Sequence, residues 1–346
     1  MLYSPHEQVK PIKNRNFSSS MSEFLLNVKD LSVTFGKAEV VSKVSFALRR
    51  GEVLALVGES GCGKSTASLA VTGLLAPQAK RTAETIIFNS RKGSADLGRL
   101  PAKEVRKYRG CGIACIFQEP SVSLNPVMTV RSQIAEVIRL HRKEVREVDE
   151  EIIKLLEQVG IPDAPNRLKA YPHELSGGMQ QRVMIAMALA GNPELLIADE
   201  PTTALDVTVQ AQILELLARL RKQRDMAILL ISHNLGVVSA LADRIAVMYA
   251  GQIVETGSCR QIIDSPAHPY TRALLAAVPQ LGRKCGRLQT IPGFVPSPEE
   301  YVSGCRFCDR CNLAMPECRS VRPGLTELSP GHFAACPCAA EKGVER

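Results

Sequence analysis

The chain has 346 residues, 45% of them hydrophobic, and a formal net charge of +8. A chain of this length can bury a core large enough to fold without disulfides, and nowhere does it contain the roughly 18 consecutive apolar residues of a transmembrane helix. The basic residues are spread along the chain, which favours a mixed solvated surface over a nucleic-acid site, and the eleven cysteines indicate metal or redox chemistry in a reducing cytoplasm.

The first part of the chain, residues 1–20, is polar and lacks apolar periodicity, so we expect a disordered tail there. From residue 21 onward, short runs rich in Val, Ile and Leu alternate with amphipathic helical patterns. The clearest runs are GEVLALVG (51–58), GIACIFQEP (112–120), ELLIADEP (194–201) and MAILLISH (226–233). Continuous apolar runs of this length are typical of strands buried on both faces. The alternation therefore predicts an α/β domain around a largely parallel sheet.

The segment GESGCGKST follows the first of these runs and precedes the helical pattern STASLAVTGLL, which is the context that a phosphate-binding loop requires. Its glycines let successive backbone N–H groups face phosphate oxygens, and the helix N-terminus adds positive potential. Lys64 would reach the β- and γ-phosphates of a nucleotide, and Ser65 would bind Mg²⁺. The predicted phosphate-binding residues are Gly58, Glu59, Ser60, Gly61, Cys62, Gly63, Lys64, Ser65 and Thr66.

A second glycine-rich turn, LSGGMQQR at 175–182, precedes the helical pattern QQRVMIAMALA. Its backbone N–H groups would again face an anion, with Ser176 adding a hydroxyl donor beside Gly177 and Gly178. One nucleotide does not need two phosphate cradles from one chain. Two chains that face each other head to tail would use one cradle each.

The run ELLIADEP predicts a buried strand that ends in two carboxylates. Asp199 would hold Mg²⁺, as an acidic residue at a strand end does in phosphate-loop enzymes. Glu200, one residue later, would polarise the attacking water as a general base. Many strands end in acidic residues, and the signal gains weight here because a phosphate-binding loop lies upstream.

Together these motifs resemble the ATP-binding-cassette (ABC) ATPases, in which the signature LSGGQ completes the nucleotide site of the opposite subunit. Met179 stands here in the place of the glutamine. The resemblance covers about residues 24–260. It implies a P-loop NTPase fold with a mixed sheet core, a nucleotide-binding domain over 21–265 with a helical subdomain at about 120–190, and ATP hydrolysis with Mg²⁺.

The resemblance also implies roles for four further residues. Phe35 in SVTFG would stack on adenine, and Gln118 in IFQEP would contact Mg²⁺ and water and move with a membrane partner. Asp206 in TALD would lie on the loop that crosses the dimer, and His233 in LISHN would contact the γ-phosphate as part of the catalytic group. Taken alone, Phe35 fits a core residue and His233 a surface residue at a strand end.

An ATPase of this kind can serve transport or act on nucleic acid. DNA-repair relatives carry long coiled coils between the phosphate loop and the signature, and no sustained heptads occur in that part of this chain. Ribosome-acting relatives carry two cassettes, whereas one is present here. We therefore prefer a transporter ATPase and expect no nucleic-acid partner. A nucleic-acid-acting ATPase with an iron–sulfur tail and a free regulatory ATPase stay open as alternatives.

Prolines become frequent from about Pro266, after MYAGQIVETG, which predicts two short strands about a glycine turn. We place a domain boundary there. SPAHPYTRALLAAVP (265–279) and IPGFVPSP (291–298) resemble the C-terminal extension of oligopeptide and dipeptide importers, a group that includes nickel and glutathione importers. The resemblance implies an extension over 266–346 and import of a small solute. Di- or oligopeptides are the preferred solute class, and nickel and glutathione are the alternatives.

The importer resemblance implies partners as well. It implies a second, non-identical ABC ATPase subunit, two transmembrane permease subunits, and an extracytoplasmic solute-binding protein that acts through the permeases. The chain would then be a peripheral subunit on the cytoplasmic face of the cell membrane.

Six cysteines crowd the end of the chain: Cys305, Cys308, Cys311, Cys318, Cys336 and Cys338. Cys305, Cys311, Cys318 and Cys336 match the spacing with which some members of the importer family hold a [4Fe–4S] cluster, and four thiolates are the standard ligand set. Zinc also takes four thiolates. We prefer the iron–sulfur cluster, with zinc and an unligated or disulfide-bonded group as alternatives. A structural or oxidation-sensing role is favoured over catalysis.

Overall fold

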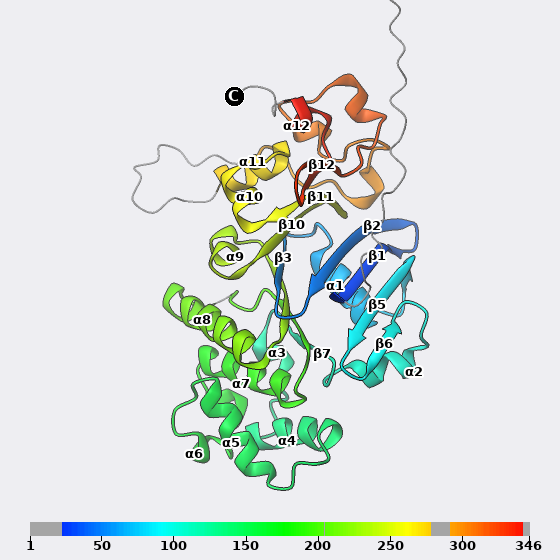
Figure 1. The fold of residues 1–346 in the computed structure, drawn as a ribbon. Coiled ribbons are helices and arrows are strands. Elements are labelled where there is room, and N and C mark those ends of the chain that lie inside the picture. The colour runs from blue at the N-terminus through cyan, green and yellow to red at the C-terminus, as the bar shows by residue number, and fades with distance from the viewer. Residues whose placement is uncertain (1–22, 204, 278–290, 342–346) are drawn as a thin grey trace, which may run out of the picture.

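The computed structural model describes residues 23–203, 205–277 and 291–341 (Figure 1). The predicted tail at 1–20 and residues 278–290 of the predicted extension lie outside these ranges. Among the helices of the described ranges, none is both long enough and apolar enough to cross a bilayer.

An eight-stranded sheet in the order β12-β13-β11-β10-β3-β9-β8-β7 forms the centre of the molecule. Its middle is parallel, since β10, β3, β9, β8 and β7 pair with one another in parallel register. Every residue of β3 and β9 is buried, which explains the continuous apolar runs and confirms the predicted α/β fold. The bounds are β3 Val53–Val57, β7 Ile113–Ile116, β8 Leu195–Asp199, β9 Ala227–Ser232 and β10 Arg244–Tyr249.

A second, antiparallel sheet in the order β2-β1-β5-β6, with β4 also paired to β1, packs over one face of the large sheet. Helix α1 (Lys64–Thr72) lies in the same layer, and its Ala67 and Val71 are fully buried in the core that the two sheets share. This layer therefore holds the start of α1 against β3. The bounds are β1 Phe24–Phe35, β2 Ala38–Arg49, β4 Ala79–Thr82, β5 Thr85–Ser90 and β6 Gly93–Asp96.

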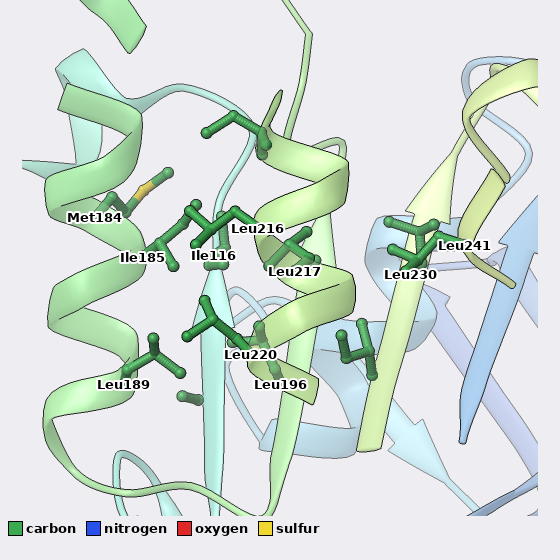
Figure 2. Packing of buried hydrophobic residues seen from close by; sticks show 14 of the residues in the cluster. Ile116, Met184, Ile185, Leu189, Leu196, Leu216, Leu217, Leu220, Leu230 and Leu241 are labelled. Atoms are coloured by element: carbon green, nitrogen blue, oxygen red, sulfur yellow. The ribbon is translucent and has the colours of Figure 1, made fainter. Parts of the chain in front are cut away.

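Helices cover the other face of the large sheet (Figure 2). Aliphatic side chains of α7 and α8 meet those of β7, β8 and β9, and burial stabilises each by roughly 1.5–3 kcal/mol. The contacting residues include Met184, Ile185 and Leu189 of α7, Leu216, Leu217 and Leu220 of α8, and Ile116, Leu196 and Leu230 of the strands. The bounds are α2 Ala102–Val105, α3 Pro120–Ser123, α4 Val130–His141, α5 Val148–Gln158, α6 Ala164–Arg167, α7 Gly177–Ala190, α8 Val207–Arg224 and α9 Leu235–Leu241.

The C-terminal part of the chain continues the large sheet. Strand β13 pairs antiparallel with β11, and β12 pairs with β13. The sequence did not predict these two strands, because each is only three or four residues long and shows no apolar periodicity. The bounds are β11 Gln252–Ser258, α10 Cys259–Asp264, α11 Pro269–Ala276, β12 Thr326–Ser329, β13 His332–Ala334 and α12 Pro337–Glu341.

A buried carboxylate fixes this junction. Glu255 of β11 is fully buried and accepts hydrogen bonds from the backbone N–H groups of Ala267 and His268, at 2.7 and 2.9 Å. Its Oε1 also lies 2.8 Å from Nε2 of His332 in β13. One carboxyl group therefore ties the start of α11 and the last strands to the sheet, and these contacts satisfy its buried oxygens.

Candidate functional site

The predicted phosphate loop runs from the end of β3 to the start of α1, and two of its glycines are also crowded by neighbouring backbone. Gly58 has a φ of 156° and Gly63 a φ of 99°. A Cβ at Gly58 would collide with the carbonyl oxygen of Met248, and a Cβ at Gly63 would lie 3.0 Å from that of Val40. The loop is thus pressed between β10 and β2 in a conformation that other residues rarely adopt.

Lys64 places its ammonium group inside this loop. The side chain is buried, and Nζ donates to the carbonyl oxygens of Gly58 and Glu59 at 2.8 and 2.9 Å. Cys62 is fully buried, and burial raises the pKa of its thiol. The cysteine therefore packs as a neutral side chain while the loop presents the lysine charge to its concave side.

The loop meets β8 at Ser65. Its hydroxyl donates to Oδ1 of Asp199 at 3.0 Å. Burial raises the pKa of Asp199, although the hydrogen bond from Ser65 and the charge of Lys64 oppose that rise. A hydroxyl and a carboxylate oxygen held this close at the end of a strand are ligands of the kind that Mg²⁺ takes, together with waters and phosphate oxygens. The residues present fit the predicted magnesium site.

Glu200 gathers the other predicted catalytic residues. Its Oε2 accepts from Gln118 Nε2 at 3.2 Å and from the Thr203 hydroxyl at 2.9 Å, and its Oε1 lies 2.9 Å from His233 Nδ1. Burial alone would raise the pKa of Glu200, but the hydrogen bonds from His233 and Thr203 lower it below the ordinary value. Glu200 is therefore an ionised acceptor at neutral pH, as a general base must be.

The backbone at Glu200 is strained, with a φ of 48°. Residues other than glycine adopt such a conformation at a cost of about 1–3 kcal/mol, and sites of this kind cluster where function fixes a side chain. Thr203 was not among the predicted site residues. In the sequence, Thr203 could be noticed only as the last residue of the turn EPTT, three positions after Glu200. Turns of this kind are too common for the sequence to identify Thr203 as a site residue.

Phe35 ends β1 at the edge nearest the phosphate loop. It pairs in register with Ala38 of β2 and Ala79 of β4, and its half-buried side chain packs against the core between the sheets. The same stretch of β2 contacts Gly63 through Val40. Phe35 thus lies on β1 beside β2, the strand that borders the loop, and its contact with adenine stays a prediction.

The second glycine-rich turn lies on another surface together with Asp206. Ser176 caps α7 by accepting from Met179 N at 3.4 Å, and Asp206 caps α8 by accepting from Val209 N at 3.0 Å. A Cβ at Gly178 would lie 3.1 Å from Val209, so the two helix starts are adjacent.

Ser176 and Gly177 are exposed, and no hydrogen bond among the described residues joins them to the phosphate loop. These residues begin the fourteen-residue helix α7, and their contact with a nucleotide held by a facing chain stays a prediction.

All six clustered cysteines line one small cavity beside His268 and Phe307; they are Cys305, Cys308, Cys311, Cys318, Cys336 and Cys338. In the described ranges, no three Cys, His, Asp or Glu side chains converge into a ready-made metal site. The cavity therefore collects the donors without fixing which of them bind together.

The four predicted ligands share a backbone feature. Each thiol receives a backbone hydrogen bond: Cys305 from Phe307, Cys311 from Leu313, Cys318 from Met315 and Cys336 from Cys338. Burial raises the pKa of Cys305 and of Cys336 to about 11, so both are neutral thiols until a cation displaces the proton. Soft thiolates with N–H donors suit a zinc or iron–sulfur centre. Cys308 receives the same kind of bond from Asp309 and is not distinguished from the four.

Two protein families match parts of the chain. The ABC transporter family matches residues 41–203, and the family described as oligopeptide/dipeptide transporter, C-terminal region, matches residues 254–318. The second match includes four of the six clustered cysteines and ends at Cys318.

Several named proteins are similar over nearly the whole chain. The dipeptide transport ATP-binding protein DppD of Escherichia coli is 49% identical over 90% of this chain and 96% of its own length. DppD of Bacillus subtilis is 47% identical over 91% and 94%. The probable peptide ABC transporter ATP-binding protein y4tR of Sinorhizobium fredii is 48% identical over 92% and 96%.

Solved structures are similar in fold. The cbiO1 protein of Clostridium perfringens, part of the ABC transporter complex cbiONQ, superposes with a TM-score of 0.58 and 25% identity over 70% of this chain and 92% of its own. A dimeric ATP-binding cassette bound to ADP and phosphate gives a TM-score of 0.59 with 24% identity over 68% and 99%. At that identity the second match supports the fold alone.

Proposed function

Since the chain belongs to the family of ABC transporter ATP-binding proteins that serve oligopeptide and dipeptide transport, we propose that it hydrolyses ATP to energise the import of di- or oligopeptides. The observation that carries the ATPase assignment is the hydrogen bond between Ser65 and Asp199. The next residue, Glu200, contacts both Gln118 and His233. The relatives named for peptide transport support the solute class. Nothing in them favours nickel, glutathione or nucleic acid.

In the proposed mechanism, the N–H groups of residues 58–66 hold the β- and γ-phosphates and Lys64 turns its ammonium onto them. Ser65, Asp199 and Gln118 would hold Mg²⁺, and the bound ion would screen the phosphate charge. Glu200 accepts a proton from the attacking water, and His233 holds the carboxylate and reaches the γ-phosphate. Phe35 supplies the ring on which adenine stacks.

A complete site requires a second cassette. Ser176, Gly177, Gly178 and Asp206 lie on an exposed surface away from this chain's phosphate loop, which supports a role on the nucleotide of a facing subunit. The proposed assembly has a second, non-identical ATPase, two transmembrane permeases and an extracytoplasmic solute-binding protein that acts through them. In this assembly the chain is peripheral, on the cytoplasmic face of the membrane. We divide it into a nucleotide-binding domain over 21–265 and an extension over 266–346.

Transport by the assembled complex tests this function. The chain is co-expressed with candidate permeases and a second ATPase in vesicles, and ATP-driven uptake of a labelled dipeptide is measured with unlabelled dipeptide, glutathione or Ni²⁺ as competitor. Competition by dipeptide alone is expected. Absence of dipeptide uptake, with ATP-driven uptake of labelled glutathione or Ni²⁺ by the same vesicles, would replace the peptide assignment, and ATPase activity that responds to nucleic acid would replace the transport assignment.

For the cysteine cavity, we propose that Cys305, Cys311, Cys318 and Cys336 bind a [4Fe–4S] cluster. Their shared cavity and their backbone N–H donors support a thiolate-bound centre there, while the choice of these four over Cys308 and Cys338 rests on their spacing in the sequence. Such a centre would tie segments from both sides of β12 and β13 together and add folding stability to a part of the chain with little core of its own.

Iron and zinc analysis of anaerobically purified protein tests the cluster. We expect brown protein with roughly four irons per chain. Colourless protein with one zinc would replace the cluster by a zinc site, and colourless metal-free protein would overturn both assignments.

A further inference from the structure

The cysteine-rich segment, residues 305–338, forms hydrogen bonds with the phosphate loop at Glu59. Arg310 donates from Nη1 to Glu59 Oε2 at 2.8 Å and from Nη2 to Glu59 Oε1 at 3.0 Å. Two parallel bonds of this kind fix the relative orientation of the guanidinium and carboxylate planes as well as the distance between the two groups. The Arg310 side chain is 6% exposed and that of Glu59 27%, so solvent screens the pair only in part.

Further contacts hold Arg310 itself in place. Its Nε donates to the carbonyl oxygen of Pro292 at 2.7 Å, and its Nη1 lies 3.3 Å from the hydroxyl of Tyr249. The guanidinium therefore has partners on several sides and reaches Glu59 in one orientation. Because the guanidinium is held in one orientation, a shift of the Arg310 backbone would shift the Glu59 carboxylate as well.

The backbone of Glu59 has a second partner from the same part of the chain. Its N–H donates to the hydroxyl of Tyr270 at 2.8 Å. The Tyr270 ring is fully buried and packs against Tyr249 and Phe307, with centroids 4.6 and 5.4 Å apart. Glu59 is thus held by both its main chain and its side chain.

These contacts matter for nucleotide binding because Glu59 is also a partner of Lys64. The carbonyl oxygen of Glu59 accepts from Lys64 Nζ at 2.9 Å. In addition, the Glu59 carboxylate is a negative charge within the loop that is to hold phosphates. The Arg310 guanidinium cancels this charge at contact distance. Both effects favour a loop that is shaped and charged for an anion.

We propose that Arg310 is a positioning residue for nucleotide binding, which makes the cysteine-rich segment a structural part of the phosphate site. The inference rests on the proposed nucleotide site and extends it. Arg310 lies between Cys308 and Cys311, and Phe307 lines the cysteine cavity while contacting Tyr270. The same short segment, 307–311, therefore forms the wall of the cavity and the clamp on the loop.

A double-mutant cycle on the full-length chain tests this role, with the equilibrium affinity for a fluorescent ATP analogue as the readout. Arg310→Gln leaves the Glu59 carboxylate unpaired beside the phosphates, and we expect binding about tenfold weaker. Glu59→Gln removes the charge but keeps an amide oxygen that can still accept from Arg310, so we expect a smaller loss, of about threefold. In the double variant no charge is left unpaired although the two-bond contact is lost, so we expect the loss to fall from about tenfold to about threefold.

The matched control is Arg319→Gln. Arg319 lies in the same segment but is 68% exposed and pairs with Asp309, away from the loop. We expect unchanged affinity, since exposed pairs contribute little. Where Arg310→Gln does not purify as folded protein, Arg310→Lys replaces it, with an expected loss of about threefold.

Two results would overturn the proposal. Binding by Arg310→Gln within twofold of the unmodified protein would show that the contact does not position the loop. An equal loss in Arg310→Gln and in the double variant would show a general packing effect. An unmodified chain that binds no nucleotide would overturn the proposed function and this inference with it. That outcome is distinct from the two above, in which the unmodified chain binds nucleotide and only the affinities of the variants decide.

Discussion

The exchange Glu200→Gln tests the proposed chemistry most directly. The amide oxygen of glutamine can still accept from Thr203 and Gln118, while its NH₂ group faces His233 Nδ1 and can donate to that nitrogen. The hydrogen-bond network therefore survives and only the proton acceptor is lost. A positioned general base is worth roughly 10²–10⁴ in rate. This corresponds to about 3–5 kcal/mol of transition-state stabilisation, at about 1.4 kcal/mol for each factor of ten.

The assay is steady-state ATP hydrolysis by the assembled complex, with nucleotide affinity measured alongside. We expect affinity within about threefold of the unmodified protein and a thermal midpoint within about 2 °C, because the substitution is isosteric. Thr203→Val is the matched control. It removes one of three donors to the same carboxylate and should cost at most about tenfold. Turnover by Glu200→Gln within tenfold of the unmodified complex, with nucleotide binding intact, would refute the assignment of Glu200 as the base.

The pKa of Glu200 adds a pH criterion to the same assay. Its folded value lies below the ordinary value of 4.5, so Glu200 stays ionised and competent as pH falls to that point and loses its proton-accepting form only below it. Hydrolysis should therefore show no acid limb from Glu200 above about pH 4.5. A limb near neutral pH that disappears in Glu200→Gln would contradict this.

Further changes test the other parts of the site. Lys64→Ala should weaken ATP binding at least about tenfold, because it removes the positive charge that would contact the phosphates. Unchanged affinity would count against the assignment of the phosphate loop. Ser176→Arg should abolish turnover at the partner's loop yet spare nucleotide binding by this chain, and a loss of its own binding would contradict the facing-cassette arrangement. Glu255→Gln should cost about 3–5 kcal/mol of unfolding free energy by leaving buried donors poorly paired, measured by chemical denaturation. Cys305→Ser should lose bound iron while Cys308→Ser keeps it, and the reverse result would revise the ligand set.

The sequence predicted those parts of the molecule whose signals are local. The apolar runs marked the buried parallel strands, and the glycine spacing of residues 58–66 marked the phosphate loop, because each depends on neighbours within one short segment. The resemblance to ABC ATPases also implied that Gln118, Glu200 and His233 belong to one site. The structure places these three side chains in hydrogen-bond contact.

Other contacts carried no readable signal in the chain. Tyr270 and Arg310 reach Glu59 across 211 and 251 positions, and nothing in either segment indicates which partner it meets. The strands β12 and β13 are too short to show a period, and they form because β11 offers an open edge. The buried Glu255 likewise looks like a surface acid within ETGS until its three donors are brought to it by the fold.

The contact at Glu59 changes how the cysteine cavity relates to ATP. A ligand in the cavity that moves segment 307–311 must alter the Arg310 bond to Glu59. Linkage then requires that ATP alter the cavity's affinity for that ligand by the same factor, because both equilibria share one set of end states. Under the proposal made for Arg310, the extension would thus be joined to nucleotide binding through the phosphate loop itself. The double variant at Arg310 and Glu59 is then the change that would uncouple occupancy of the cavity from the affinity for ATP.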